Sequence, residues 1–211
     1  MAISPRSLTT SDAALRTRLV TCLHQLGVTA ATGARVSPRR EPDLDLQPAA
    51  VLVPLLLGGG GPKLLLTVRT QTLKDHPGQI SFPGGRRHAT DGSAEQTALR
   101  ECQEEIGINT EAIELLGRLP DCETVTGFRI TPVVGLLAAP PRLRLSPVEV
   151  AATLSVPLSF LLDFSHLEQH CVEDAGQPRD YFVYQYETHR IWGATAAIIV
   201  DLCRRLRGEP A

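Results

Sequence analysis

Three glutamates lie close together near the end of a predicted helix and could bind a metal ion. Glu101, Glu104 and Glu105 are spaced i, i+3 and i+4, so they share one arc of a helix. The negative end of the helix dipole and the repulsion between carboxylates both disfavour this cluster, and Arg100 can offset only part of the cost. A hard divalent cation with oxygen ligands would remove the conflict. The cluster therefore predicts a metal site, although a solvated acidic helix face would show the same spacing.

The helix that would present these carboxylates has clear start and end signals. Ser93, with Gln96 three residues later, forms a capping box, and Gly107 stands where a glycine commonly ends a helix. The predicted helix therefore covers residues 94–106. At about 100° per residue, its apolar side chains gather on one arc that we expect to be packed, namely Ala98, Leu99, Cys102 and Ile106.

Residues 85–108 closely resemble the Nudix box, a family pattern written G-x5-E-x7-R-E-U-x-E-E-x-G-U, in which U is apolar. The match runs from Gly85 through Arg100 and Glu101 to Ile108. Two departures precede the acidic end: Asp91 replaces a glutamate, and one extra residue separates it from Arg100, so no role is assigned to Asp91. The resemblance implies an α/β fold, an α/β/α sandwich around a mixed β-sheet in which the box forms a loop–helix–loop.

Further segments are similar to the coenzyme A (CoA) pyrophosphatase branch of that family. These segments are residues 65–70, 76–85, 127–135 and 191–196. The branch implies metal-dependent hydrolysis of the pyrophosphate bond of CoA and its thioesters, giving 3′,5′-ADP and 4′-phosphopantetheine or its acyl form. The implied substrate is a small nucleotide derivative, and the implied cofactor is Mg²⁺ or Mn²⁺.

The resemblance also implies roles for the acidic helix. Glu101, Glu104 and Glu105 would hold the metal, with Glu101 and Glu105 as the principal ligands and Glu104 assisting. Metal ions held there would neutralise the phosphates and lower the pKa of a bound water. We expect Arg100 to orient Glu104 through an ion pair rather than to contact the substrate.

Residues outside the helix complete the expected site. Gly84 and Gly85 would let the backbone approach the metal, and a carbonyl there could be a ligand, although a simple loop would look the same. Family members often take the general base from outside the box, and Glu149 is our candidate. An exposed charge beside a strand or turn is the alternative for Glu149.

The 3′-phosphate of CoA favours a basic partner. Arg69 and Lys74 lie in the branch segment, and Arg86 and Arg87 flank the predicted metal loop. Arg69 and Lys74 are our candidates for substrate binding, and any of the four could instead be a solvated surface charge.

Two other functions remain open. A Nudix hydrolase could act on ADP-ribose, a dinucleotide or a nucleoside triphosphate. A Nudix-fold binding module without turnover is the third hypothesis, but the complete run 100–107 argues against it. The segments 65–85 and 191–196 favour CoA over the other substrates.

The remaining elements are interspersed helices and strands, which indicates an α/β or α+β fold with a mixed sheet. Residues 29–47 are polar and contain prolines, so we expect a surface connection there. We expect an N-terminal helical extension (1–35) and a Nudix domain (36–211) within one globular unit. Strands are predicted at 49–57, 63–70, 79–82, 113–118, 128–137 and 181–186, and further helices at 11–26 and 194–206.

Composition excludes several classes of protein. The chain has 211 residues, 21 Lys plus Arg and 23 Asp plus Glu, for a net charge of −2, so a large nucleic-acid interface is not expected. No segment has the roughly 18–20 apolar residues that span a bilayer, and no secretory signal is visible. Five scattered cysteines fit reduced thiols, so we expect a cytoplasmic protein. A homodimer is an open possibility.

Three other patterns have simpler explanations than a functional site. Residues 58–61 are four glycines without the spacing of a phosphate loop, so they predict a hairpin turn. His166 and His170 resemble half a zinc site, but no third ligand is evident. The aromatic residues that could stack adenine more often serve packing: Tyr181, Tyr184, Tyr186 and Trp192.

Overall fold

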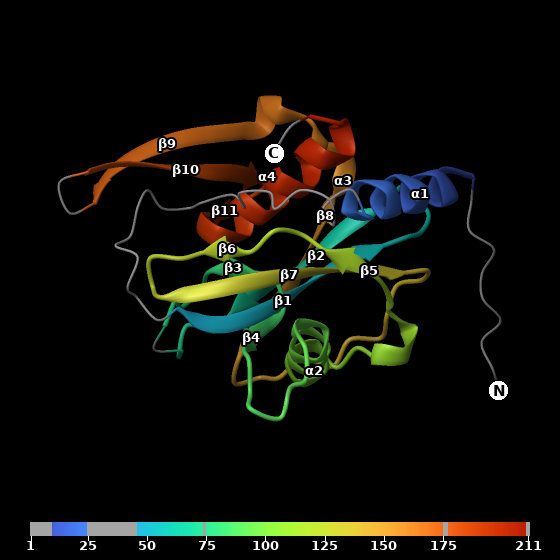
Figure 1. Ribbon diagram of the computed structural model, residues 1–211, viewed down its shortest axis with the longest axis horizontal. Coiled ribbons are helices and arrows are strands. Elements are labelled where there is room, and N and C mark those ends of the chain that lie inside the picture. Colours follow the sequence, from blue (N-terminus) through green and yellow to red (C-terminus); the bar gives the residue numbers. More distant parts are fainter. Residues whose placement is uncertain (1–9, 25–45, 74, 175–176, 210–211) are drawn as a thin grey trace.

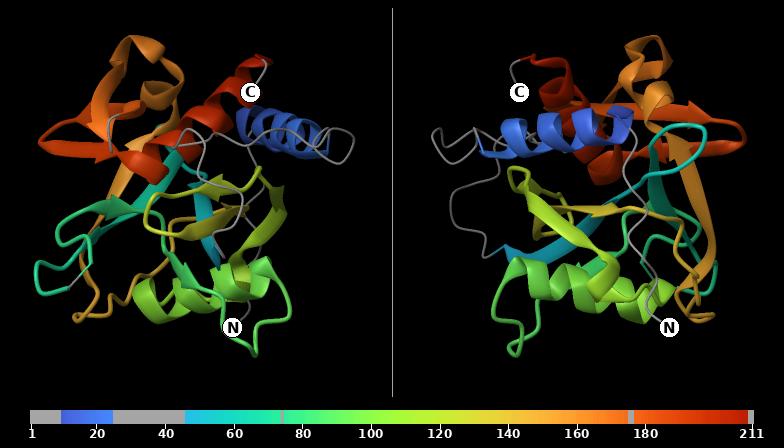
Figure 2. Two further views of the ribbon diagram at one scale, coloured as in Figure 1. Left: turned by 60° about the vertical axis from the view of Figure 1, so that its left-hand side comes forward. Right: turned by 90° about the vertical axis from the view of Figure 1, so that its right-hand side faces the viewer.

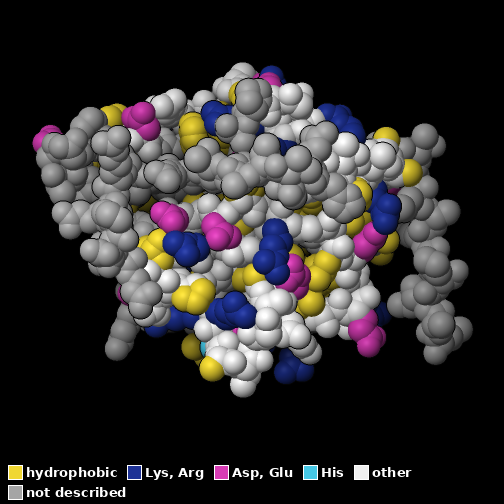
Figure 3. All heavy atoms as spheres, in the orientation of Figure 1, with side chains coloured by type: hydrophobic (Ala, Val, Ile, Leu, Met, Phe, Trp, Pro, Cys, Tyr) yellow, Lys and Arg dark blue, Asp and Glu magenta, His cyan; other side chains and the backbone are white. Residues whose placement is uncertain are grey.

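The computed structural model describes residues 10–24, 46–73, 75–174 and 177–209. Three layers are visible in Figures 1 and 2: a central sheet, helix α2 (Ala94–Ile106) on one face, and helices α1 (Thr10–His24) and α4 (Gly193–Arg207) on the other. The α/β/α arrangement implied by the sequence is confirmed. None of the described helices is long and apolar enough to cross a bilayer. On the face drawn in Figure 3, basic and acidic side chains lie interspersed among hydrophobic ones.

The central sheet is mixed. Its main order is β3-β2-β1-β7-β5, while β4 pairs with β1, β6 with β7 and β8 with β2. β1 and β7 are parallel over ten residue pairs, from Gln47↔Phe128 to Leu56↔Leu137, and the other pairs are antiparallel. The strands are β1 (Gln47–Leu56), β2 (Lys63–Arg69), β3 (Ile80–Ser81), β4 (Gly84–Arg86), β5 (Glu114–Arg118), β6 (Cys122–Glu123), β7 (Phe128–Leu137) and β8 (Val150–Pro157).

A second, three-stranded sheet lies beside α4 (Figure 1) and has the order β11-β10-β9. Its strands are β9 (Leu167–Asp174), β10 (Gln177–Tyr186) and β11 (His189–Trp192), and short helices α3 (Leu158–Leu162) and η3 (Phe164–His166) lead into it. Tyr184 is fully buried and donates a hydrogen bond to the Leu161 carbonyl at 3.0 Å, so its predicted packing role is confirmed.

The helix that carries the acidic cluster begins and ends as predicted. Ser93 Oγ accepts a hydrogen bond from Gln96 N, and Gly107 ends α2 in the left-handed conformation with φ 67°. The second half of the predicted capping box differs, because the Gln96 side chain accepts from Gly92 N instead of Ser93 N. The predicted apolar arc of α2 packs against the sheet, with Ala98, Cys102 and Ile106 fully buried.

All six predicted strands and both other predicted helices are present, with ends shifted by at most four residues. The hairpin turn at 58–61 is confirmed by the β1–β2 pairing and by a hydrogen bond from Gly61 N to the Gly58 carbonyl. β4, β6, β8, β9, β11 and α3 were not predicted. The predicted end of the first helix at Leu26 and most of the connection 29–47 lie outside the described residues.

Helix α1 contributes to the same core as α4. Leu19, Cys22 and Leu23 are buried against residues of α4 and the sheet, and the Arg18 guanidinium donates to the Leu206 carbonyl. This packing supports our proposal that the N-terminal extension and the main domain form one globular unit.

We expect Leu19→Ala to lower the free energy of unfolding by about 2–4 kcal/mol, because it leaves a cavity in the shared core. Urea denaturation measures this change, with Thr21→Ala, an exposed neighbour on the same helix, as the matched control. Equal stability of the two variants would contradict a single cooperative unit.

Candidate active site

Strand β4 brings two glycines against two of the predicted carboxylates. Gly84 N donates a hydrogen bond to Glu105 Oε2 at 3.2 Å. A Cβ on Gly85 would lie 2.5 Å from Glu101 Oε1, and a Cβ on Gly84 would lie 2.5 Å from the Ala50 carbonyl oxygen. No other residue fits at either position without displacing the carboxylate or the adjacent strand. The close backbone approach expected at Gly84 and Gly85 is therefore present.

Glu101 and Glu105 lie in a strained electrostatic environment. Glu105 is only 6% exposed, and burial, followed by the charge of Glu101, raises its pKa to about 8. Burial also raises the pKa of Glu101, although the hydrogen bond from Arg100 lowers it in part. Both carboxylates would be stabilised as anions by a cation placed between them. This pair of carboxylate donors beside the Gly84–Gly85 backbone fits a hard divalent ion.

Glu104 has a different environment. It is 56% exposed and accepts a hydrogen bond from Arg100 Nη1 at 3.0 Å. Within the described part of the chain, no three His, Cys, Asp or Glu side chains converge as a ready-made metal site. The structure therefore groups Glu101 with Glu105 and leaves Glu104 at the edge.

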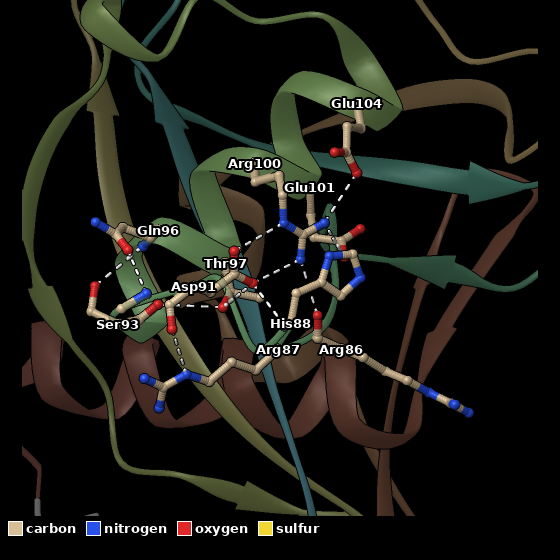
Figure 4. A network of polar contacts seen from close by, with 11 residues as sticks. Arg86, Arg87, His88, Asp91, Ser93, Gln96, Thr97, Arg100, Glu101 and Glu104 are labelled. Carbon is tan, nitrogen blue, oxygen red and sulfur yellow. Dashed lines mark hydrogen bonds and ion pairs between the residues drawn. The ribbon is translucent and has the colours of Figure 1, made fainter.

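Arg100 is the centre of a polar network (Figure 4). Its guanidinium donates to both Asp91 oxygens at 2.9 and 3.2 Å, to Glu101 at 2.9 Å, to Glu104 at 3.0 Å and to the Arg86 carbonyl at 3.1 Å. These five bonds occupy all five N–H donors of the side chain. Arg100 has no donor left for a substrate, which agrees with the expected ion pair to Glu104 and extends it to Glu101.

Asp91 corrects the sequence interpretation, which gave it no role. It is 8% exposed, and it also accepts hydrogen bonds from His88 N at 2.9 Å and Thr97 Oγ1 at 3.0 Å. The Arg100 hydrogen bonds, followed by the one from His88 N, hold its pKa well below the ordinary value. Asp91 therefore anchors Arg100 despite the shorter side chain and the extra loop residue.

The loop before β8 brings Glu149 towards Glu105. Ser146 N donates to the Glu105 carbonyl at 2.8 Å, and Thr70 N donates to the Glu149 carbonyl at 3.0 Å. Thr70 Oγ1 donates to the Val148 carbonyl at 2.8 Å. Glu149 is exposed, and its charge contributes to the raised pKa of Glu105. The loop is thus bound to both α2 and β2, which the sequence did not indicate.

Arg69, at the end of β2, is a basic side chain whose charge acts on Glu105. Its positive charge partly lowers the pKa of Glu105, and its Nη2 donates to the Asp75 carbonyl at 3.3 Å. Its Nε is buried without a hydrogen-bond partner among the described residues. A buried unsatisfied donor beside a carboxylate pair is unusual and indicates a place for an anionic group.

The other candidates are distributed differently. Lys74 lies outside the described residues, and Arg87 donates from Nε to the Asp91 carbonyl at 3.1 Å. His166 stacks on Phe160 and His170 contacts Glu168, so the structure does not bring the two histidines together with a third ligand among the described residues.

A cavity of about 500 Å³ borders the end of α2. It is lined by Gln103, Glu104, Gly107, Arg144, Leu145, Ser146 and Pro147. It touches Glu104 but neither Glu101 nor Glu105.

This chain is similar to known proteins in sequence and in structure. A NUDIX domain model matches residues 46–153. "Uncharacterized Nudix hydrolase NudL" of Enterobacter sp. (strain 638) is 39% identical over 167 residues, covering 79% of this chain and 86% of that protein. The protein of the same name from Photorhabdus laumondii subsp. laumondii is 41% identical, covering 75% and 84%. The crystal structure of a Nudix hydrolase from M. smegmatis, RenU, is 23% identical, covers 56% of this chain and 74% of that chain, and has a TM-score of 0.47.

Glu105 couples stability to pH. Its pKa of about 8 lies above the ordinary value of 4.5, so between these values the folded chain binds a proton that the unfolded chain releases. The contribution of Glu105 to the free energy of unfolding of the metal-free protein therefore falls as pH rises through this window.

We expect Glu105→Gln to raise the free energy of unfolding of the metal-free protein by about 1–3 kcal/mol at pH 8, and to change it much less near pH 4.5. The amide oxygen can still accept the Gly84 hydrogen bond. Urea denaturation in EDTA at both pH values measures the difference, and Glu111→Gln, at an exposed position, is the matched control. A less stable Glu105→Gln variant at pH 8 would contradict the proposed strain.

Proposed function

The chain belongs to the Nudix hydrolase family, and we propose that, within it, the protein hydrolyses the pyrophosphate bond of CoA and its thioesters. The products would be 3′,5′-ADP and 4′-phosphopantetheine or its acyl form. The observation that carries the hydrolytic site is the pairing of the buried Glu105 with the half-buried Glu101 beside the Gly84–Gly85 backbone. The choice of CoA rests on the resemblance of residues 65–85 and 191–196 to the CoA pyrophosphatase branch.

Glu101 and Glu105 are the proposed principal ligands of a divalent metal, Mg²⁺ or Mn²⁺, and Glu104 assists from the edge. A bound divalent ion supplies charge neutralisation at the pyrophosphate and a water of lowered pKa. The contribution of Arg100 is to fix Glu101 and Glu104, since its donors are all used within the chain. Arg100 is thus a positioning residue.

Arg69 is the proposed partner of a pyrophosphate oxygen. Its Nε is buried and has no hydrogen-bond partner within the part of the chain that the structure describes, and its charge acts on Glu105. A phosphate bound at the carboxylate pair would therefore lie within its field. Such a charge-assisted hydrogen bond would orient the phosphorus atom for attack. This role differs from the 3′-phosphate contact considered for Arg69 on sequence grounds.

Glu149 is the proposed general base that takes a proton from the attacking water. The Ser146 and Thr70 hydrogen bonds hold its loop beside Glu105, which supports this role. Efficient general-base catalysis requires such a fixed carboxylate close to the water.

The substrate is tested directly by incubating the purified chain with Mg²⁺ and, separately, CoA, acetyl-CoA, ADP-ribose, NADH or dGTP, with products identified by mass spectrometry. We expect 3′,5′-ADP to form fastest, from CoA or its thioester. Glu105→Gln is the control for contaminating hydrolases, because it should give no product while remaining folded. Faster cleavage of ADP-ribose or NADH would retain the hydrolytic site and reject CoA as substrate. Absence of turnover with all five would leave a binding module.

The base is tested by steady-state kinetics. We expect Glu149→Gln to lower kcat by about 10²–10⁴-fold, the usual contribution of a positioned base, with KM changed little. Glu111→Gln again serves as control. A kcat within about two-fold of the wild type would exclude Glu149 as the base, since proton transfer by that side chain would then contribute nothing.

A further inference from the structure

Arg86 is a cation next to the active site that the mechanism above does not use. Its backbone is fixed: Arg86 pairs with Ala49 of β1, and its carbonyl accepts a hydrogen bond from Arg100. It directly follows Gly85, which contacts the Glu101 carboxylate on the α2 side of the sheet. Because neighbouring side chains of a strand alternate, Arg86 points to the opposite side.

The Arg86 guanidinium lies over the ring of Phe128, 5.1 Å from its centroid. In Figure 4 its side chain points away from the Arg100 network. It makes no hydrogen bond or ion pair with any residue that the structure describes. One of its faces and its donors are therefore not used by any of the described residues, and a ligand could take them.

Hydrogen bonds fix the backbone at Phe128. Its N–H donates to Thr124 Oγ1 at 3.1 Å, its carbonyl accepts from Thr124 N at 2.9 Å, and Gln47 N donates to the preceding carbonyl at 2.8 Å. The ring is half-buried at the start of β7. Arg86 and Phe128 thus form a preorganised flat surface one residue away from the glycine that contacts Glu101.

We propose that Arg86 and Phe128 form the subsite for the purine base of the nucleotide substrate, with the base stacked on the guanidinium. The proposal rests on the proposed function for the identity of the ligand. A site built for the 3′-phosphate would gather several cations. Here Arg86 stands with an aromatic ring instead, since Arg129 pairs with Glu123 at 3.4 Å and Arg87 donates to the Asp91 carbonyl. Stacking on guanidinium and aromatic planes is the typical recognition of a base without hydrogen-bond readout.

Calorimetric titration with AMP, 3′,5′-ADP and ribose 5-phosphate tests this subsite without requiring turnover. We expect Arg86→Lys, which keeps the charge but loses the plane, and Phe128→Leu each to weaken AMP binding by about ten-fold. Ribose 5-phosphate should change by less than about two-fold, because it lacks the base that stacks. Arg129→Lys is the matched control and should bind all three ligands as the wild type does. Unfolding midpoints verify that the variants are folded. If Phe128→Leu does not fold, the AMP affinity of Arg86→Lys alone decides the test.

Four results would overturn the subsite. These are an equal loss for AMP and ribose 5-phosphate, a larger loss for 3′,5′-ADP than for AMP, unchanged AMP binding in Arg86→Lys, and no AMP binding by the wild type. CoA cleavage with unchanged AMP affinities would reject the subsite and keep the proposed function. AMP binding that depends on the base, without CoA cleavage, would keep the subsite and reject the proposed function.

Discussion

The burial of the Glu105 carboxylate beside that of Glu101 is the constraint on which the rest of the site depends. The two side chains lie one turn apart on α2. Burial raises the pKa of both, repulsion from Glu101 raises that of Glu105 further, and β4 places glycine backbone against them. A structure selected only for stability would avoid this arrangement. Here the surrounding elements maintain it, through the Gly84 N–H, the Arg100 network and the packing of α2 on the sheet.

The chemistry follows from how that repulsion is balanced. Positive charge reaches the pair from Arg69 and Arg100. Arg100 is fully engaged within the chain, whereas Arg69 keeps a buried donor that no described residue accepts from. The site therefore has one fixed internal cation, one cation with a free hydrogen-bond donor, and a remaining need for positive charge that a divalent ion would meet. An anionic substrate would use the free donor. Such a distribution suits hydrolysis of a pyrophosphate bond.

Local sequence signals predicted both ends of α2, because the capping serine and Gly107 each act on the adjacent turn of the helix. The apolar arc between them repeats with the period of the helix. The same box placed Glu101 and Glu105 correctly on one face. The missed strands carry weak local signals and form through pairing with other strands. β8 forms by pairing with β2, which is distant in the sequence. β4 has only three residues, of which two are glycine, and β9 is rich in charged residues. The anchoring of Arg100 by Asp91 and the clamping of the Glu149 loop also depend on contacts between distant segments.

Metal binding by the individual glutamates tests the central claim most directly. Calorimetric titration of Mn²⁺ into the wild type, Glu101→Gln, Glu104→Gln and Glu105→Gln compares the three side chains in one experiment. The carboxylate-pair account predicts that Glu101→Gln and Glu105→Gln each weaken Mn²⁺ binding by at least about ten-fold, the scale on which lost ligands act, whereas Glu104→Gln has a smaller effect. Wild-type affinity in Glu105→Gln, or the largest loss in Glu104→Gln, would contradict it.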